Sequence, residues 1–313
     1  MRSTTIPARL RRFADRLSSA GRVRRTWALL LLTAGFGALF AGCAGTGPVR
    51  EGARPPEAGV INPLRLDRSV VALVLGAGGA RGFAHVGVIK ALEGAGIVPD
   101  IVVGSSSGSI VAALYAAGHG GARLEEMALA LEDAEVIDYT LAGNGWVRGE
   151  ALRDYVNRSV GHRGIEALAR PFAVVATEAQ SGAMTVFTSG ETGLAVRASS
   201  TVPKLFVPPV INGKEYLDGG LSSRVPSTVA RRMGADVVIA VDISRGRGVT
   251  EADQQATDVV IRPVVPRTRM LDFTQKRASI AAGEAAALDV IADVHRLIEL
   301  SRVRKAAIAA ARR

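Results

Sequence analysis

The chain has 313 residues and a net charge of +10 at pH 7, but the charge is concentrated at one end. Residues 1–43 carry eight arginines and one acidic residue, so the rest of the chain has a net charge of only +3. A nearly balanced body without basic runs between aromatic residues argues against nucleic-acid binding. The 35 glycines, with 48% hydrophobic and 4% aromatic residues, suit an α/β fold with an aliphatic core and many tight turns.

The first predicted element is an export signal. A basic stretch ends at Arg24–Arg25, and an apolar run of 15 residues, Trp27–Ala41, follows it. A membrane-spanning helix needs roughly 20 apolar residues, so this length is typical of a signal h-region. The run ends L-F-A-G-C, which resembles the lipobox of bacterial lipoproteins, although Phe40 stands where an aliphatic residue is usual. The resemblance implies lipidation of Cys43, the single cysteine; a plain hydrophobic anchor is the alternative.

The predicted signal sets expectations for the N-terminal organisation and the location. We expect residues 1–43 to be a lipoprotein-type signal segment and residues 44–68, with their Gly, Pro and Arg, to be a flexible tether. In Gram-negative lipoproteins, Asp after the cysteine favours retention at the inner membrane, so Ala44 is compatible with the outer membrane. The prediction is an exported, membrane-anchored lipoprotein of the outer membrane or periplasm.

The body opens with two strand–turn–helix units. Val70–Leu75 is an apolar run of strand length, and the glycine-rich stretch 76–82 separates it from Phe83–Ala95, whose apolar residues have helical spacing. The β-branched run Ile101–Val103 and the small-residue helix Ser107–Ala117 repeat the pattern. Units of this length predict an α/β fold with a mainly parallel central sheet covered by helices.

The rest of the chain contains further segments with the patterns of strands and of helices. Residues 123–170 predict helices and loops. The C-terminal stretch 296–313 is predicted to be a basic helical tail, and its charge fits either a solvated tail or a contact with a membrane surface. We place the folded domain at residues 69–295. The expected strands are Phe172–Thr177, Met184–Thr188, Glu215–Leu217, Asp236–Ile243 and Val259–Val265, and the expected helices are Leu194–Ser200, Val225–Met233 and Ala278–Arg313.

A G-x-S-x-G motif runs from Gly104 to Gly108 with Ser106 at its centre. It lies between a predicted strand and a predicted helix, which is the context of a nucleophile elbow. The sharp turn exposes the Ser106 hydroxyl at the end of the strand, near the positive end of the next helix. Flanking glycines remove side chains that would clash. Five small residues also occur by chance, so the motif needs support from elsewhere in the chain.

The glycine-rich stretch 76–82 supplies a second motif. A dinucleotide fingerprint that began at Gly76 would need glycine where Arg81 stands, and a phosphate loop would need Gly-Lys-Ser/Thr, which is absent. The stretch fits an oxyanion site instead, because unencumbered backbone N–H groups and a helix N-terminus can stabilise developing negative charge. Arg81 could add a full positive charge toward an oxyanion or a lipid phosphate, or could form a structural ion pair.

The third motif is Asp218-Gly219-Gly220, directly after an apolar strand. A carboxylate there can accept a hydrogen bond from Ser106 and take its proton. Free carboxylates are weak bases with a pKa near ~4, so positioning must compensate. An ordinary Asp-Gly turn is the alternative interpretation.

The order of these three motifs resembles that of the patatin-like phospholipases, from about Val70 to about Val290. The resemblance rests on the segments 78–88, 104–115, 197–203 and 217–221. It implies a three-layer α/β/α sandwich, a Ser–Asp dyad of Ser106 and Asp218, phospholipid or lysophospholipid as substrate, and no metal or organic cofactor. The implied oxyanion hole comprises Gly78, Gly79, Ala80, Arg81 and Gly82.

The chain departs from the family pattern at two places, and three alternative functions stay open. Ala77 stands where the family commonly has Gly, and Ser223-Arg224 stands where it often has Asn-Pro. A Ser–Asp–His triad would need His295, which lies in a helical stretch rather than on a loop. The protein could also be a catalytically silent lipid-binding lipoprotein or a nucleotide-binding protein. We expect His85 to pack near the oxyanion loop.

Overall fold

The computed structural model describes residues 54–141, 145–244 and 248–311. The chain divides into two units after Glu51, and the second unit, Gly52–Arg313, holds all the described residues. The predicted signal segment 1–43 with Cys43, and the first part of the predicted tether, lie outside the described residues.

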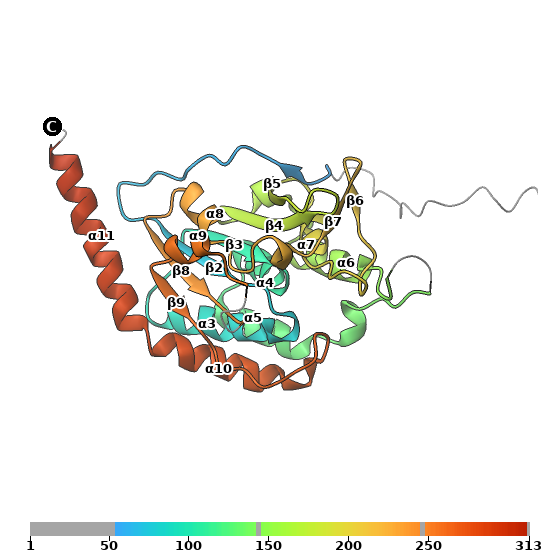
Figure 1. Ribbon diagram of the computed structural model, residues 1–313. Helices are drawn as coiled ribbons and strands as arrows, with labels where there is room; N and C mark the ends of the chain where they lie inside the picture. The colour runs from blue at the N-terminus through green and yellow to red at the C-terminus, as the bar shows by residue number, and fades with distance from the viewer. Residues whose placement is uncertain (1–53, 142–144, 245–247, 312–313) are drawn as a thin grey trace, which may run out of the picture. The chain divides into compact units, whose positions relative to one another are not determined.

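The domain is built around one nine-stranded sheet (Figure 1). The main path runs β1-β5-β4-β3-β2-β8-β9, and β7 adds to β4 and β6. Neighbouring strands from β4 to β9 along this path are parallel, which confirms the predicted mainly parallel sheet. The strands are β1 (Glu57–Ala58), β2 (Val71–Leu75), β3 (Ile101–Ser105), β4 (Phe172–Glu178), β5 (Met184–Ser189), β6 (Val210–Ile211), β7 (Lys214–Leu217), β8 (Val237–Val241) and β9 (Val259–Ile261).

Each central strand is apolar along its whole length because both faces of the sheet are covered. In β2, Val71, Leu73 and Leu75 contact the larger hydrophobic cluster, and the residues between them contact the smaller one. Side chains alternate between faces along a strand, so a strand buried on both sides reads as a continuous apolar run.

Helices lie on both faces, which gives the three expected layers (Figure 1). Helices α3 to α7 and α10 contribute to the larger cluster, whereas α8 and residues 61–66 cover the opposite face. The helices are α3 (Phe83–Gly94), α4 (Ser107–Ala116), α5 (Gly121–Ala130), α6 (Glu150–Ser159), α7 (Thr192–Ser199), α8 (Ser227–Arg232), α9 (Glu251–Gln255), α10 (Lys276–Leu288) and α11 (Ile291–Ala311).

Two glycines bring α3 and α10 into backbone contact. A Cβ on Gly87 of α3 would lie 1.9 Å from the carbonyl oxygen of Ile280, and a Cβ on Gly283 of α10 would lie 1.9 Å from that of Ala84. Only residues without a side chain permit this approach. The contact fixes the start of α10, and with it the segment that leads into α10.

The structure corrects the extent of the predicted tether. Residues 54–68 do not hang free of the domain: β1 pairs antiparallel with β5, and the N–H of Leu64 donates to the carbonyl of Met233 over 2.7 Å. Arg68 forms an ion pair with Asp100 at 2.5 Å. The attachment has no signal in the sequence, because a strand of two residues carries no periodicity.

The predicted boundary at residue 295 is also displaced, because α11 runs through it without a break. The tail is partly docked on the domain. Lys305 donates to Asp236 Oδ2 over 2.7 Å, and the hydroxyls of Ser301 and Ser69 lie 3.0 Å apart. Within the described ranges, no helix combines the length and the apolar character that crossing a bilayer requires.

Replacing Gly87 by Ala is expected to lower the free energy of unfolding by about 3 kcal/mol, because the new methyl group must push α10 away from α3. Gly94 of the same helix is the matched control. A Cβ there meets nothing within 4 Å, so Gly94→Ala should be neutral or slightly stabilising. Urea unfolding of both variants measures the difference. Equal stabilities would contradict the close helix contact.

Candidate active site

Ser106 and Asp218 meet because two strands end against the same edge of β4. Strand β3 runs parallel to β4 and ends at Ser105, and β7 runs antiparallel to β4 and ends at Leu217. The two registers place the next position of both strands level with Ala176 of β4. The chain therefore delivers the two predicted residues to one point from opposite directions.

The backbone of Ser106 has the left-handed conformation of a sharp strand-to-helix turn, with φ 53° and ψ −130°. This region costs a residue other than glycine on the order of 1–3 kcal/mol, so surrounding contacts must hold it. The N–H of Ser106 donates to the Ser199 hydroxyl over 2.8 Å, and that hydroxyl donates to the Val175 carbonyl over 2.6 Å. Ser199, at the end of α7, thus ties the Ser106 backbone to β4.

The two elbow glycines are required by close packing. A Cβ on Gly104 would lie 2.4 Å from the Cα of Ser109, and a Cβ on Gly108 would lie 2.1 Å from the carbonyl oxygen of Leu75. Helix α4 can approach the sheet at these points only because both side chains are absent. The predicted role of Gly104 and Gly108 as clash-free positions agrees with this geometry.

The Ser106 hydroxyl donates a hydrogen bond of 2.6 Å to Oδ2 of Asp218. The other carboxylate oxygen of Asp218, Oδ1, accepts a hydrogen bond from the N–H of Gly220 over 2.8 Å. The backbone of Asp218 is fixed as well, because its N–H donates to Thr201 and its carbonyl accepts from the Thr177 hydroxyl. The carboxylate therefore has one orientation, with Oδ2 directed at the serine.

Burial raises the pKa of Asp218 from 3.8 to about 6. The hydrogen bonds from Ser106 and Gly220 and the positive charge of Arg224 favour the ionised form, but they offset only part of the desolvation. A carboxylate with this pKa is a better proton acceptor than a solvated one and is still ionised at neutral pH.

Among the residues of the predicted oxyanion hole, some backbone N–H groups already donate a hydrogen bond within the protein and others do not. The N–H of Ala80 donates to the Met270 carbonyl over 2.8 Å. The N–H groups of Gly78 and Gly79 make no hydrogen bond to any described residue. Arg81 and Gly82 complete the 3-10 turn Gly79–Gly82 that leads into α3.

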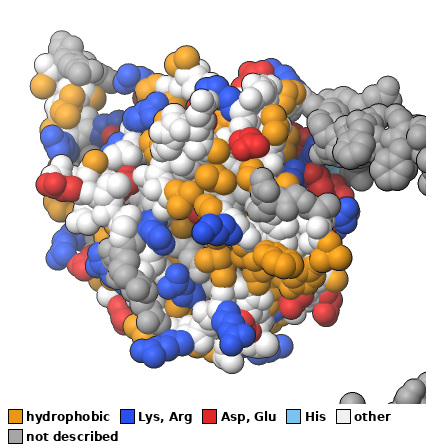
Figure 2. Space-filling model, turned by 45° about the vertical axis from the view of Figure 1, so that its right-hand side comes forward, with side chains coloured by type: hydrophobic (Ala, Val, Ile, Leu, Met, Phe, Trp, Pro, Cys, Tyr) orange, Lys and Arg blue, Asp and Glu red, His pale blue; other side chains and the backbone are white. Residues whose placement is uncertain are grey.

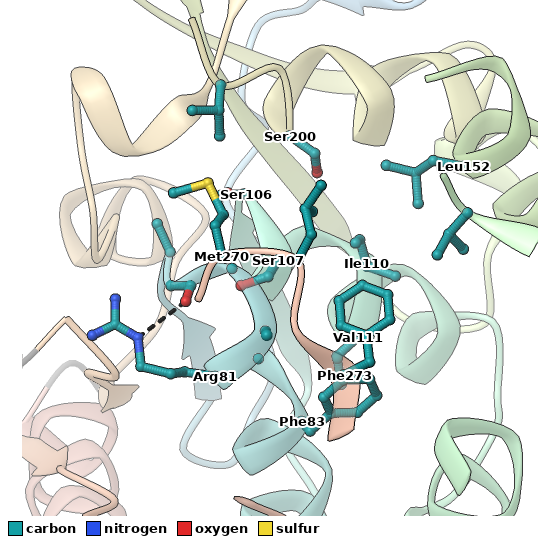
Figure 3. A pocket seen from close by; sticks show the side chains of 18 of the residues that line it. Arg81, Phe83, Ser106, Ser107, Ile110, Val111, Leu152, Ser200, Met270 and Phe273 are labelled. Atoms are coloured by element: carbon teal, nitrogen blue, oxygen red, sulfur yellow. Dashed lines mark hydrogen bonds between the residues drawn. The ribbon is translucent and has the colours of Figure 1, made fainter. Parts of the chain in front are cut away.

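The Arg81 side chain lies among the residues that line the cavity beside Ser106, and it also braces the glycine-rich loop. Its Nε donates to the Gly78 carbonyl over 3.0 Å (Figure 3). In this view its guanidinium points away from Ile110 and Val111 of the pocket wall. Gly79 has a φ of +60°, and a Cβ there would lie 2.9 Å from the carbonyl oxygen of Met270. The glycine is needed both for this backbone conformation and for the contact with Met270.

Neither histidine considered from the sequence contacts Ser106 or Asp218. His85 is buried at the start of α3, and its Nε2 lies 2.9 Å from the Gly76 carbonyl. Burial lowers the pKa of His85 to about 4, so it is neutral at pH 7 and fixes the start of the oxyanion loop. His295 lies on α11, 3.1 Å from the carbonyl of Ala95. The structure therefore does not bring a Ser–Asp–His triad together.

The departures from the family pattern have structural roles. Ala77 donates its N–H to the Arg224 carbonyl over 2.8 Å, so its methyl group precedes the two available donors without displacing them. Ser223 accepts a hydrogen bond from the Ser105 hydroxyl at its carbonyl and donates from its own hydroxyl to Asp253. The segment after Asp-Gly-Gly is thereby tied to the elbow.

An apolar cavity of about 250 Å³ adjoins Ser106 and Asp218 (Figure 3). Part of its lining comes from residues 123–170, for which the sequence predicted helices and loops. Apolar residues of α4, α5, α6 and the intervening segment form one wall: Ile110, Val111, Leu114, Leu124, Met127, Leu131, Val136, Ile137, Leu152 and Tyr155.

A second wall was not predicted from the sequence. Met270, Leu271 and Phe273 lie between β9 and α10 and line the same cavity. The Phe273 ring contacts the Phe83 ring edge-on, with 5.4 Å between centroids. These residues precede α10 in a segment without helical or strand periodicity, so only the tertiary structure reveals that they face the cavity.

The patatin-like phospholipase family matches residues 73–231, about half of the chain. The chain belongs to this family. Patatin-like phospholipase domain-containing protein 6 of Mus musculus is 38% identical over 189 residues, which are 57% of this chain and 14% of that protein. An NTE family protein of Mycobacterium tuberculosis, named as uncharacterized, is 36% identical over 180 residues, 56% of this chain and 49% of that protein. The chain thus spans less than half of these relatives.

A solved structure agrees at the level of the fold. VipD from Legionella pneumophila has a TM-score of 0.53 and 12% sequence identity, covering 79% of this chain and 72% of that one. The predicted patatin-like identity and fold class are therefore confirmed, and Ser106 and Asp218 both lie within the matched region.

The raised pKa of Asp218 predicts that Asp218→Asn stabilises the patatin-like domain above pH 6. The ionised carboxylate is buried at a cost of order 3 kcal/mol at pH 8, a cost that neutral Asn avoids. Below pH 4 Asp218 is protonated in both the folded and the unfolded protein. The stability advantage of the variant should therefore grow from pH 4 to pH 6 and then stay level. Urea unfolding at five pH values measures it, and a pH-independent difference would contradict the prediction.

Removing the Ser199 hydroxyl is expected to lower kcat for ester hydrolysis without a comparable change in KM. Ser199→Ala leaves the Ser106 N–H unpaired, and such a loss costs about 1–3 kcal/mol, so kcat should fall about ten- to a hundredfold. Ser199→Thr keeps the hydroxyl and should restore part of the rate. Ser227→Ala is the control, because that buried serine bonds Thr257 outside the pocket. A similar loss in kcat for the control would refute positioning by Ser199.

Proposed function

We propose that the protein is a membrane-associated serine lipid acyl hydrolase of the phospholipase A or lysophospholipase type. The observation that carries the proposal is the 2.6 Å hydrogen bond from the Ser106 hydroxyl to Asp218 at the edge of an apolar cavity. Membership of the patatin-like phospholipase family supports lipid hydrolysis.

In the first half of the reaction, the acyl chain lies in the apolar cavity and the ester carbonyl faces Ser106. Ser106 Oγ attacks the carbonyl carbon while Asp218 Oδ2 takes its proton. The N–H groups of Gly78 and Gly79 stabilise the oxyanion, together with the N-terminus of α4 that begins after the elbow. The tetrahedral intermediate then collapses, Asp218 returns the proton to the leaving alcohol, and an acyl-Ser106 ester remains.

In the second half, water enters the position that the alcohol vacated. Asp218 takes a proton from the water as its oxygen attacks the acyl carbon, and the same N–H groups stabilise the second oxyanion. Expulsion of Ser106 Oγ, reprotonated by Asp218, releases the fatty acid and restores the starting state. Each proton removed is returned, so the cycle requires only ester and water.

The wall of the cavity supports a phosphate-bearing leaving group. Arg224 lines the cavity with Asp218 and Gly220, and its guanidinium makes no ion pair or hydrogen bond to another described residue. A half-buried cation beside the reacting ester matches the phosphate of a phospholipid or lysophospholipid. Lipidation at Cys43 in the cell envelope, proposed from the sequence, would hold this site near such lipids.

Ser106→Ala is expected to abolish hydrolysis of a lysophospholipid, with a loss of at least a thousandfold in kcat. His295→Ala is the matched control and should retain the wild-type rate, because that exposed side chain lies on α11 and its Nε2 is 3.1 Å from the Ala95 carbonyl. In the wild type, kcat should rise with pH through about 6 as Asp218 ionises, and then level off. Fatty-acid release over pH 4–9 measures all three.

Two results would contradict the proposal in different ways. Equal rates for the wild type and Ser106→Ala would indicate a lipid-binding protein without turnover through this serine. A large loss in His295→Ala would require a triad that the fold does not assemble.

A further inference from the structure

Three large side chains on the stretches before and after residues 142–144 are exposed. Tyr139 is 73% exposed, Leu141 97% and Trp146 64%. They lie on two paired stretches: Tyr139 forms a bridge with Val147, and the N–H of Thr140 donates to the Trp146 carbonyl over 2.8 Å. Two aromatic residues and a leucine on one exposed pair of stretches mark an interaction surface.

These stretches are joined directly to the wall of the cavity. The N–H groups of Trp146 and Val147 both lie 2.9 Å from the carbonyl oxygen of Leu205. The neighbouring residues Val202 and Phe206 line the cavity. The exposed aromatic residues are thus fixed to a segment that lines the cavity.

Two further exposed apolar residues line the cavity itself. Leu221 follows Asp-Gly-Gly and is 54% exposed, and Met270 is 46% exposed, although both line the cavity. We call Tyr139, Leu141, Trp146, Leu221 and Met270 the mouth surface. Figure 2 turns forward the right-hand side of Figure 1, where α6 and β6 are labelled, and hydrophobic side chains gather there beside Lys and Arg.

Basic side chains predominate beside the mouth surface. Four exposed basic residues occur in the described parts of 139–148, 202–206 and 267–271, whereas the flanking acidic residues Asp138 and Asp272 are less exposed, and Arg148 lies 3.7 Å from Asp138. The four are Arg148, Lys204, Arg267 and Arg269. Cations around an exposed apolar centre complement a surface of phosphate groups over acyl chains.

We infer that the mouth surface docks on a phospholipid surface, with Tyr139, Leu141 and Trp146 entering the interfacial layer. This inference rests on the proposed function. Tyr and Trp favour the boundary between headgroups and acyl chains, because their rings are apolar and their polar ends stay wet. Docking there would place the cavity over the lipid, so that an acyl chain could pass from the lipid layer to Ser106 without crossing water.

The chain offers a local reporter for this contact. It has two tryptophans, Trp27 and Trp146, so Trp27→Phe in the full-length protein leaves Trp146 alone. Adding Ser106→Ala prevents hydrolysis from altering the vesicles. We expect the Trp146 emission to shift to shorter wavelength on 1:1 phosphatidylcholine–phosphatidylglycerol vesicles and to be quenched by acyl-brominated lipid, with a weaker effect on phosphatidylcholine alone.

Matched variants in this background test the surface itself. Tyr139→Ser with Leu141→Ser keeps the reporter but removes its apolar neighbours, and should lower vesicle affinity at Trp146 about tenfold or more. Val98→Ser is the control: Val98 is 54% exposed, but it precedes β3 and so lies at the opposite end of that strand from Ser106. This variant should match its parent.

The outcomes separate the docking surface from the catalytic proposal. Absence of quenching, or equal quenching in the double variant, would overturn docking through the mouth surface even if the wild type hydrolyses a soluble ester. A blue shift that grows with protein concentration without vesicles would assign the surface to a second copy of the chain, and would also overturn the inference. Quenching that the double variant loses would support docking whether or not the wild type is active.

Discussion

Strand β4 is the element on which the candidate site depends, because it receives β3 and β7 on the same edge. Their registers bring the residues after Ser105 and Leu217 to the level of Ala176, and the hydrogen bond between Ser106 and Asp218 closes the junction. Parallel strands such as β3 and β4 have their carboxyl ends on the same side of the sheet. Strand β7 runs in the opposite direction, so its carboxyl end, followed by Asp218, meets the carboxyl end of β3, followed by Ser106. The order of the strands is thus a condition for the chemistry.

The pairing of Ser106 with Asp218 includes two features that lower the stability of the folded state, and other contacts must offset them. Ser106 has a strained backbone, and Asp218 carries a buried carboxyl whose pKa is raised to about 6. Both are held by groups outside their own strands: Ser199 fixes the serine, and Thr177 and Gly220 fix the aspartate. Such conformations persist only where the surroundings determine them, and the same constraints orient the Ser106 hydroxyl toward the Asp218 carboxylate.

The cavity and the mouth surface extend this arrangement outward. The walls come from α4 to α6 on one side and from the segment before α10 on the other, and the Gly87–Gly283 contact sets the position of α10. For the phospholipid substrate proposed above, which is held in aggregates, the cavity must open toward that aggregate. The exposed residues beside the entrance, Tyr139 and Trp146, supply a contact of suitable chemistry.

The sequence by itself determined the mainly parallel α/β fold, the family, and the positions of Ser106, Asp218 and the glycine-rich loop. These depend on local signals: apolar runs buried on both faces, and glycines at turns that admit no side chain. It did not determine that Ala80 donates to Met270, that residues 54–68 attach to the domain, or which side chains form the cavity. Those features join segments distant in the chain, through backbone groups that every residue possesses, and only the tertiary structure selects the partners.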